Sequence, residues 1–243
     1  MLNNTMHPLM WNQLLSVMSG VVLAFGSVGC FAFDSLRDQE IKQCLSGEVV
    51  TWGDNQDMPA VSSKLVFSYS HVGSPDWFSE SQVVDALTRS ANAWSVCGIS
   101  ASVERNSQVV TPPKEVIQVR WSEEGSQHNF GLANLSNRTL NLGPAAFTLL
   151  RTRNPVHDAR QTLQMVISHE MGHLFGVMAH SRRCVDVTSY YDNGKGQQCS
   201  IRDGSMRPPG IEYRSTLLTA CDIERCKAAN GFTTVPSAGT VLR

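Results

Sequence analysis

Alternating apolar and polar positions predict β-strands in the first two thirds of the chain. The run KLVFSYSH at 64–71 has the period of two that places one face of a strand in a core. Four shorter runs repeat this pattern, and the short sequences Pro-Pro, Glu-Glu-Gly and Asn-Arg between them are typical of turns. These runs are SASVER, VIQVRW, GLANLS and TLNLG. Together with the first run they predict a small sheet.

Apolar residues three or four positions apart predict three helices. Each begins at a residue pair of the capping-box type and ends before a glycine. Trp94 lies on the apolar face of the first helix, so we expect it to pack in the core. The second helix should run from about 158 through 173. The capping pairs and terminating glycines are Ser79 with Gln82 and Gly98, Asp158 with Gln161 and Gly176, and Thr219 with Asp222 and Gly231.

The bulk composition points to one folded domain. The chain has 243 residues, of which 42% are hydrophobic, enough to bury one sizeable core. It carries 20 Lys and Arg against 21 Asp and Glu, scattered along the sequence. We therefore expect no nucleic-acid partner and no basic patch for an anionic membrane. We also expect a monomer.

The first residues predict export. The run from Leu14 to Phe33 has no charge, and Cys30 and Ala32 have the spacing of a signal-peptidase site. We therefore interpret 1–32 as a signal peptide, followed by a domain over 33–231 and a tail over 232–243. Because no Lys or Arg precedes the apolar run, a retained membrane anchor is the alternative. Acylation of Cys30 is disfavoured, since Ser27 stands where an aliphatic residue is wanted.

The cysteine count also favours an exported protein, secreted or in the cell envelope. The chain has seven cysteines, and removal of the segment with Cys30 leaves an even set suited to an oxidising compartment. A reduced protein with buried thiols is the alternative. The candidates for bridges are Cys44, Cys97, Cys184, Cys199, Cys221 and Cys226.

The last predicted helix restricts how these cysteines pair. Cys221 and Cys226 are five positions apart on it, too far for a disulfide between them. We therefore expect at least one of the two to cross to Cys184 or Cys199, and Cys44 to pair with Cys97.

The stretch HEMGHLFGVMAHS at 169–181 carries the candidate chemistry. His169 and His173 lie on one face of a helix, so both imidazoles can bind one ion, while Glu170 beside them can reach a water on that ion. Zinc lowers the pKa of bound water to about 7, and the carboxylate can then take its proton. The motif HExxH recurs by chance, but here it lies late on an amphipathic helix that ends at Gly176.

This stretch resembles the metzincin metallopeptidases, and among them the matrixin-like group. It is similar to their HExxHxxGxxH signature followed by Ser, GSMRP resembles their Met-turn, and LLTACDIERC resembles the opening of their last helix. The resemblance implies an α+β fold with a twisted, mixed, five-stranded sheet, an active-site helix and a C-terminal helix. It also implies one catalytic zinc ion, with Met206 beneath it, and an exported endopeptidase that cleaves proteins or peptides.

One position departs from that signature. Regular spacing would place the third ligand at residue 179, but Ala179 cannot bind zinc and the histidine comes one residue later. Because the chain after Gly176 is not expected to be helical, one extra residue can be looped out there. We therefore assign His180 as the third ligand. The alternatives are a carboxylate third ligand, Glu212 or Glu224, or a catalytically silent binding protein, which the intact catalytic glutamate disfavours.

The resemblance also implies where a substrate lies. An extended peptide would pair antiparallel to an edge strand, for which 131–136 is the candidate, with Gly131, Leu132 and Ala133 in contact. Ile211 and Tyr213 would wall the pocket for the residue after the scissile bond, or else pack in the core. The loop between Cys184 and Cys199 would rim the cleft or be merely solvated. His128 is expected to be a surface residue.

Overall fold

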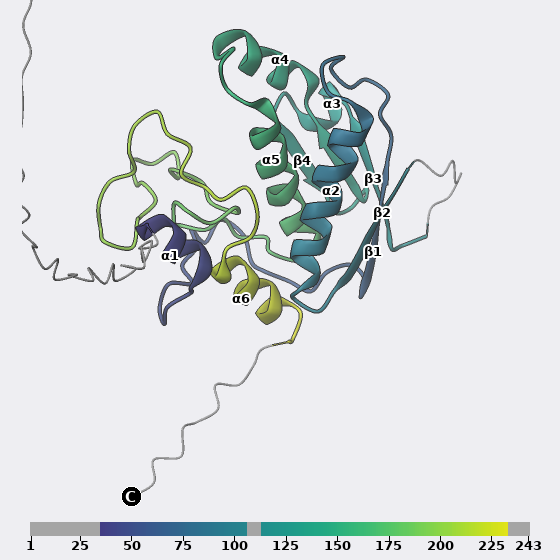
Figure 1. Ribbon diagram of the computed structural model, residues 1–243. Coiled ribbons are helices and arrows are strands. Elements are labelled where there is room, and N and C mark those ends of the chain that lie inside the picture. The colour runs from purple at the N-terminus through teal and green to yellow at the C-terminus, as the bar shows by residue number, and fades with distance from the viewer. Residues whose placement is uncertain (1–34, 106–112, 233–243) are drawn as a thin grey trace, which may run out of the picture. The chain divides into compact units, whose positions relative to one another are not determined.

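The computed structural model describes residues 35–105 and 113–232, so the predicted signal peptide and nearly all of the predicted tail lie outside the described residues (Figure 1). The described part is a mixed α/β fold with the strands mostly in its first half. Its elements are α1 (Leu36–Lys42), β1 (Lys64–Tyr69), α2 (Glu80–Ser95), β2 (Ser100–Arg105), β3 (Val116–Trp121), α3 (Glu123–Ser126), β4 (Gly131–Asn134), β5 (Thr139–Leu142), α4 (Pro144–Arg153), α5 (Ala159–Leu174) and α6 (Ala220–Ala229).

The strands form one five-stranded sheet in the order β2-β1-β3-β5-β4. The pairs β1–β2, β1–β3 and β3–β5 are parallel, whereas β4 runs antiparallel to β5. All five alternating runs are therefore strands of one mixed sheet, which is compatible with the expected α+β class. The run GLANLS supplies β4, an edge strand as predicted. Helices α2 and α5 lie together over one face of the sheet (Figure 1).

The predicted helices are confirmed, with one difference in capping. Ser79 with Gln82 and Thr219 with Asp222 form complete capping boxes at α2 and α6. At α5, the Asp158 side chain accepts a hydrogen bond from the backbone N–H of Arg160, and no capping box forms. Helices α1, α3 and α4 were not predicted, because they are short and carry little apolar periodicity.

Close packing of α2 against α5 fixes the position of the helix that carries HExxH. Trp94 is fully buried, as predicted, and its indole Nε1–H donates to the backbone oxygen of Ser168 at 2.8 Å. Gly172 leaves room for the indole, since a Cβ atom there would lie 2.8 Å from Trp94 Cζ2. Both contacts lie within one turn of His169, so this part of α5 is held by the core.

The disulfide pairing differs from the prediction. The prediction that Cys221 and Cys226 do not pair with each other is confirmed. The other two predictions are wrong: neither Cys221 nor Cys226 crosses to the 184–199 loop, and Cys44 does not pair with Cys97. Residues five apart on a helix point in different directions, so each cysteine of α6 reaches a different neighbour. Cys184 and Cys199 lie on adjacent, bridged segments of one loop and pair with each other. The bridges are Cys44–Cys221, Cys97–Cys226 and Cys184–Cys199.

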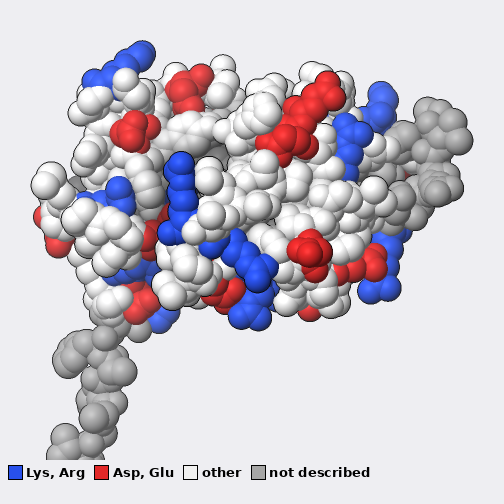
Figure 2. All heavy atoms as spheres, turned by 90° about the horizontal axis from the view of Figure 1, so that it is seen from above, with Lys and Arg blue, Asp and Glu red and all other residues white. Residues whose placement is uncertain are grey.

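These three bridges are consistent with an exported protein. Within 35–105 and 113–232, no helix is both long and apolar enough to cross a bilayer. On the face drawn in Figure 2, basic and acidic side chains are interspersed and form no large patch of one sign.

Candidate metal centre

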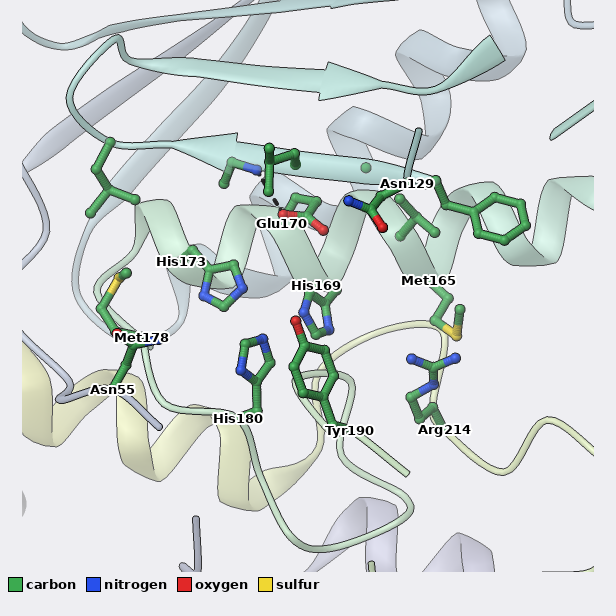
Figure 3. Close-up of a pocket in the computed structure, with 16 residues that line it drawn as sticks. Asn55, Asn129, Met165, His169, Glu170, His173, Met178, His180, Tyr190 and Arg214 are labelled. Carbon is green, nitrogen blue, oxygen red and sulfur yellow. Dashed lines mark hydrogen bonds between the residues drawn. The ribbon is translucent and has the colours of Figure 1, made fainter. Parts of the chain in front are cut away.

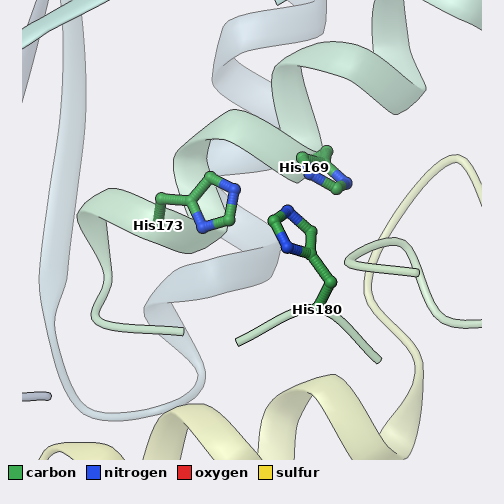
Figure 4. Close-up of side chains that lie close together, drawn as sticks. All are labelled: His169, His173 and His180. Atoms are coloured by element: carbon green, nitrogen blue, oxygen red, sulfur yellow. The ribbon is translucent and has the colours of Figure 1, made fainter. Parts of the chain in front are cut away.

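Three histidines that the sequence spreads over two segments lie together in the structure (Figure 4). His169 and His173 come from one face of α5, and His180 comes from the chain beyond the helix. Gly176 makes the turn between them with φ of +98°, and a Cβ atom there would lie 2.0 Å from the carbonyl oxygen of Met58. Only glycine fits this turn, because both its conformation and its surroundings exclude a side chain.

The three rings approach one another at similar distances. Their centroids are 5.1 Å apart for His169 and His173, 5.2 Å for His169 and His180, and 5.0 Å for His173 and His180. Each ring offers one nitrogen to a group in which all ligand atoms lie within 4.8 Å of one another. The group could therefore hold a metal ion, and the extra residue after the helix does not keep the third histidine out of it.

The outer nitrogen of each ring is already hydrogen-bonded. His169 Nδ1 lies 2.8 Å from the carbonyl oxygen of Val187, and His173 Nδ1 lies 2.9 Å from that of Val177. His180 Nδ1 lies 2.5 Å from Asp54 Oδ2. Since a carbonyl or carboxylate oxygen only accepts, Nδ1 carries the proton in each ring, and Nε2 keeps a lone pair for a ligand.

The inner nitrogen of His180 is a buried polar atom that the protein does not satisfy. Among the described residues, His180 Nε2 is the buried side-chain nitrogen or oxygen without a hydrogen-bond partner. A buried group of this kind calls for an explanation such as an ion. Three imidazole nitrogens with supported outer atoms fit a divalent metal such as zinc.

Burial keeps the His169 and His180 rings neutral. It lowers the pKa of His169 well below its ordinary value, and the neighbouring histidines act in the same direction. Burial also lowers the pKa of His180 to about 4, although the Asp54 carboxylate opposes this effect. Neutral imidazoles bind a metal without first losing a proton.

Glu170 lies beside the histidines and is tied to the edge strand. Its Oε2 accepts a hydrogen bond of 2.8 Å from the backbone N–H of Ala133 in β4. Burial raises the pKa of the Glu170 carboxyl. β4 can come this close because residue 131 is a glycine: a Cβ atom there would lie 2.5 Å from Val166 Cγ1 and 2.8 Å from Glu170 Cγ.

The histidines and Glu170 line a cleft of about 500 Å³ between β4 and the segments beyond α5 (Figure 3). Three predicted contact residues, Gly131, Leu132 and Ala133, line it. The remaining lining residues are Asn55, Asn129, Phe130, Leu135, Met165, Val166, Met178, Tyr190 and Arg214.

The two other predicted contact residues do not line the cleft. The Ile211 side chain is exposed, and the Tyr213 hydroxyl donates a hydrogen bond of 2.8 Å to the buried carboxylate of Glu40. Tyr213 packs in a second apolar cluster with the disulfide loop. The neighbouring Arg214 reaches the cleft instead, while Nε and Nη2 of its guanidinium pair with Glu212.

Met206 is not beneath the histidines, contrary to the expectation. It is 81% exposed and does not line the cleft. Residues 187–190, which belong to the Cys184–Cys199 loop, lie against the histidines instead. Within it, the ring of Tyr190 stacks on that of His180 with centroids 3.5 Å apart.

The other candidate ligands lie apart from this group. The Glu212 carboxylate is engaged by Arg214 and by the hydroxyl of Tyr191, and Glu224 is exposed on α6. His128 is exposed, as predicted, and it pairs with Glu123.

Sequence reasoning missed Asp54, Tyr190 and Arg214 as parts of the site. Tyr190 belongs to the loop that is a candidate rim of the cleft, so the sequence indicated where it would lie but not that it packs on His180. Asp54 lies in GDNQDMP, which has only the composition of a loop, and no spacing connects it with a histidine 126 positions later.

No protein-family model and no curated protein matches the chain. Among solved structures, the chain is similar to a chain described as the GM1 bound form of the ECX AB5 holotoxin. The TM-score is 0.39 and the identity 12%, over 70% of this chain and 81% of that chain. A likeness at that TM-score carries no argument about function.

Proposed function

We propose that the chain is an exported, zinc-dependent endopeptidase of the metzincin type, matrixin-like, that hydrolyses peptide bonds in a protein or peptide substrate. The observation that carries the proposal is the joint placement of three histidines whose Nε2 atoms can bind a metal, a buried glutamate and a free sheet edge along one cleft. Each is a part that hydrolysis of an extended peptide needs.

His169, His173 and His180 would hold the ion, and a group of three imidazole nitrogens suits zinc. When bound, zinc supplies Lewis-acid activation of a water and of the scissile carbonyl. The protein supports this role through the three Nδ1 hydrogen bonds, which fix the orientation of each ring.

Glu170 is the proposed proton carrier. Its carboxylate takes a proton from the attacking water and delivers it to the nitrogen of the leaving amine, so no covalent acyl intermediate is needed. The hydrogen bond from the Ala133 N–H holds one carboxylate oxygen and thereby fixes the direction of the side chain. The same contact couples the proton carrier to the strand along which the substrate would lie.

β4 is the proposed binding edge for the substrate backbone. The Gly143 N–H donates to the carbonyl oxygen of Phe130, so residues 130, 132 and 134 direct their backbone groups toward β5. The backbone carbonyls of Gly131 and Ala133 therefore point to the open side, where a peptide can add as an antiparallel strand.

Tyr190 is the proposed donor to the developing negative charge. Its ring is packed on His180, and Figure 3 shows its hydroxyl directed into the cleft. Burial raises the pKa of this phenol, so it stays protonated near neutral pH and can donate a hydrogen bond. A donor preplaced at the carbonyl oxygen stabilises the transition state more than the ground state.

The proposal is tested by metal analysis of the purified exported form, together with digestion of casein or a peptide library. We expect about one zinc per chain and cleavage that stops when a chelator removes the metal. Glu170→Gln should leave zinc bound and lower turnover by about 100-fold or more, because the proton carrier is lost while the ligands remain.

Two other outcomes would decide for the alternatives. A metal-loaded wild-type protein that cleaves nothing in the library would favour a silent binding protein on this fold. Unchanged zinc content in His180→Ala, with loss of zinc in Glu212→Gln, would favour a carboxylate third ligand.

A further inference from the structure

The segment 50–60, here called the N-terminal strap, runs along the chain that bears the third histidine. The backbone N–H of Trp52 donates to the carbonyl oxygen of His180, and the backbone N–H of Met58 donates to that of Gly176, each at 3.0 Å. An antiparallel bridge joins Thr51 to Ser181. Residues 176–182 are thus supported by a segment that precedes the first strand of the sheet.

Asp57 of the strap accepts hydrogen bonds from the backbone of the segment in which the histidine spacing departs from the regular motif. Its Oδ1 accepts hydrogen bonds from the N–H groups of Met178 and Ala179, at 2.8 Å and 2.9 Å. Arg225 of α6 pairs with this carboxylate and also donates to the carbonyl oxygen of Ala179. The extra residue therefore leaves none of these backbone groups without a partner.

Asp54 makes a different pair of contacts, both with His180. One oxygen accepts from the backbone N–H at 3.0 Å, and the other lies 2.5 Å from the ring Nδ1. The other two histidines direct Nδ1 to backbone carbonyls. One carboxylate thus holds both the backbone and the ring of the histidine that has no helix to support it.

We propose that Asp54 is the positioning residue of the third ligand, so that metal affinity depends on the N-terminal strap. The inference rests on the proposed metal site. By accepting the Nδ1–H, the carboxylate holds His180 Nε2 toward His169 and His173, and its charge makes the imidazole a stronger ligand. The site is then built from a helix and from a segment more than 100 residues earlier in the chain.

An isosteric pair of variants separates positioning from general support. Both partners of Asp54 are donors, each to its own oxygen, whereas an asparagine offers a single oxygen. Asp54→Asn therefore loses one of the two contacts in either orientation of its amide. Asp57→Asn is the matched control: its single oxygen can still accept from Met178 and Ala179, and only the pairing with Arg225 is weakened.

The test measures zinc affinity of the full exported chain by competition with a chromogenic chelator, the cobalt(II) absorption spectrum, and the melting temperature of the metal-free protein. We expect Asp54→Asn to weaken zinc binding by about 10- to 100-fold and to alter the cobalt spectrum. Its metal-free melting temperature should stay near that of the wild type, because Asp54 is 33% exposed and the other strap contacts remain. Asp54→Glu should recover part of the affinity.

Asp57→Asn should do the reverse, lowering the melting temperature and changing zinc affinity by less than Asp54→Asn does. Zinc affinity of Asp54→Asn within about twofold of the wild type would overturn the inference while leaving the metal site intact. Equal losses of zinc affinity in both variants, each with a lowered melting temperature, would also overturn the inference, since the strap would then only stabilise the fold. A wild-type chain that binds no zinc would overturn the proposed function itself.

Discussion

The two halves of the histidine group are held in different ways. His169 and His173 lie on α5, whose position is set by buried contacts such as that of Trp94 with Ser168. His180 lies on irregular chain, held by carboxylates of the strap. The first half shows how helical periodicity alone can place two ligands. The second half shows that a third ligand can be placed by hydrogen bonds from a distant segment, without regular structure of its own.

The largest expected effect comes from removing a ligand in either half. His173→Ala and His180→Ala should each weaken zinc binding by more than about 100-fold and abolish hydrolysis, because two imidazoles hold the ion loosely. Isothermal titration with zinc and a peptide-cleavage assay measure both. If His180→Ala kept wild-type affinity, the two halves would not form one site.

A smaller effect is expected where the helix half meets the substrate edge. In Gly131→Ala, the new Cβ would lie 2.5 Å from Val166 Cγ1 and 2.8 Å from Glu170 Cγ, so β4 and α5 must move apart. We expect a loss of stability of about 1–3 kcal/mol. Turnover should fall more than zinc affinity, because the contact of Ala133 with Glu170 changes while the three histidines stay. A larger fall in zinc affinity than in turnover would contradict this division.

The disulfide that anchors the chain before the strap provides a finer comparison. Cys44–Cys221 connects this chain to α6, which also carries Arg225. The double variant Cys44→Ser, Cys221→Ser should lose about 2–5 kcal/mol in free energy of unfolding. It should also weaken zinc binding several-fold, because the strap is less restrained. The matched variant Cys184→Ser, Cys199→Ser removes a bridge that closes a shorter loop, so it should lose less stability. A greater loss than in the Cys44, Cys221 variant would contradict this expectation.

The smallest effect is expected outside both halves. His128→Ala removes an exposed imidazole that pairs with Glu123 on the surface. Zinc affinity and turnover should stay within about twofold of the wild type, since exposed ion pairs contribute little. A loss of zinc would show that the ligand set has been misassigned.

The sequence predicted the regular parts of this fold because their signals are local. Alternation identified the five strands, including β4 as an edge, and capping residues placed the starts of α2 and α6. The positions of His169, Glu170 and His173 on one helix followed from spacing alone. Such patterns depend only on residues within a few turns of one another.

The errors concern contacts between distant segments. The disulfide pairing, the exposed position of Met206 and the packing of Tyr213 on Glu40 all depend on how loops cross one another. The roles of Asp54 and Asp57 could not be predicted for the same reason. Short polar residues in a loop carry no periodic signal, and their partners lie more than 100 positions away.

Whether the three histidines form one zinc site is decided by the zinc coordination of the purified exported protein, measured by X-ray absorption spectroscopy for the wild type and His180→Ala. We predict three imidazole nitrogens at about 2.0–2.1 Å from one zinc in the wild type, and one fewer around any zinc that the variant retains. Two imidazoles in both proteins, or a carboxylate as the third protein ligand of the wild type, would contradict this prediction.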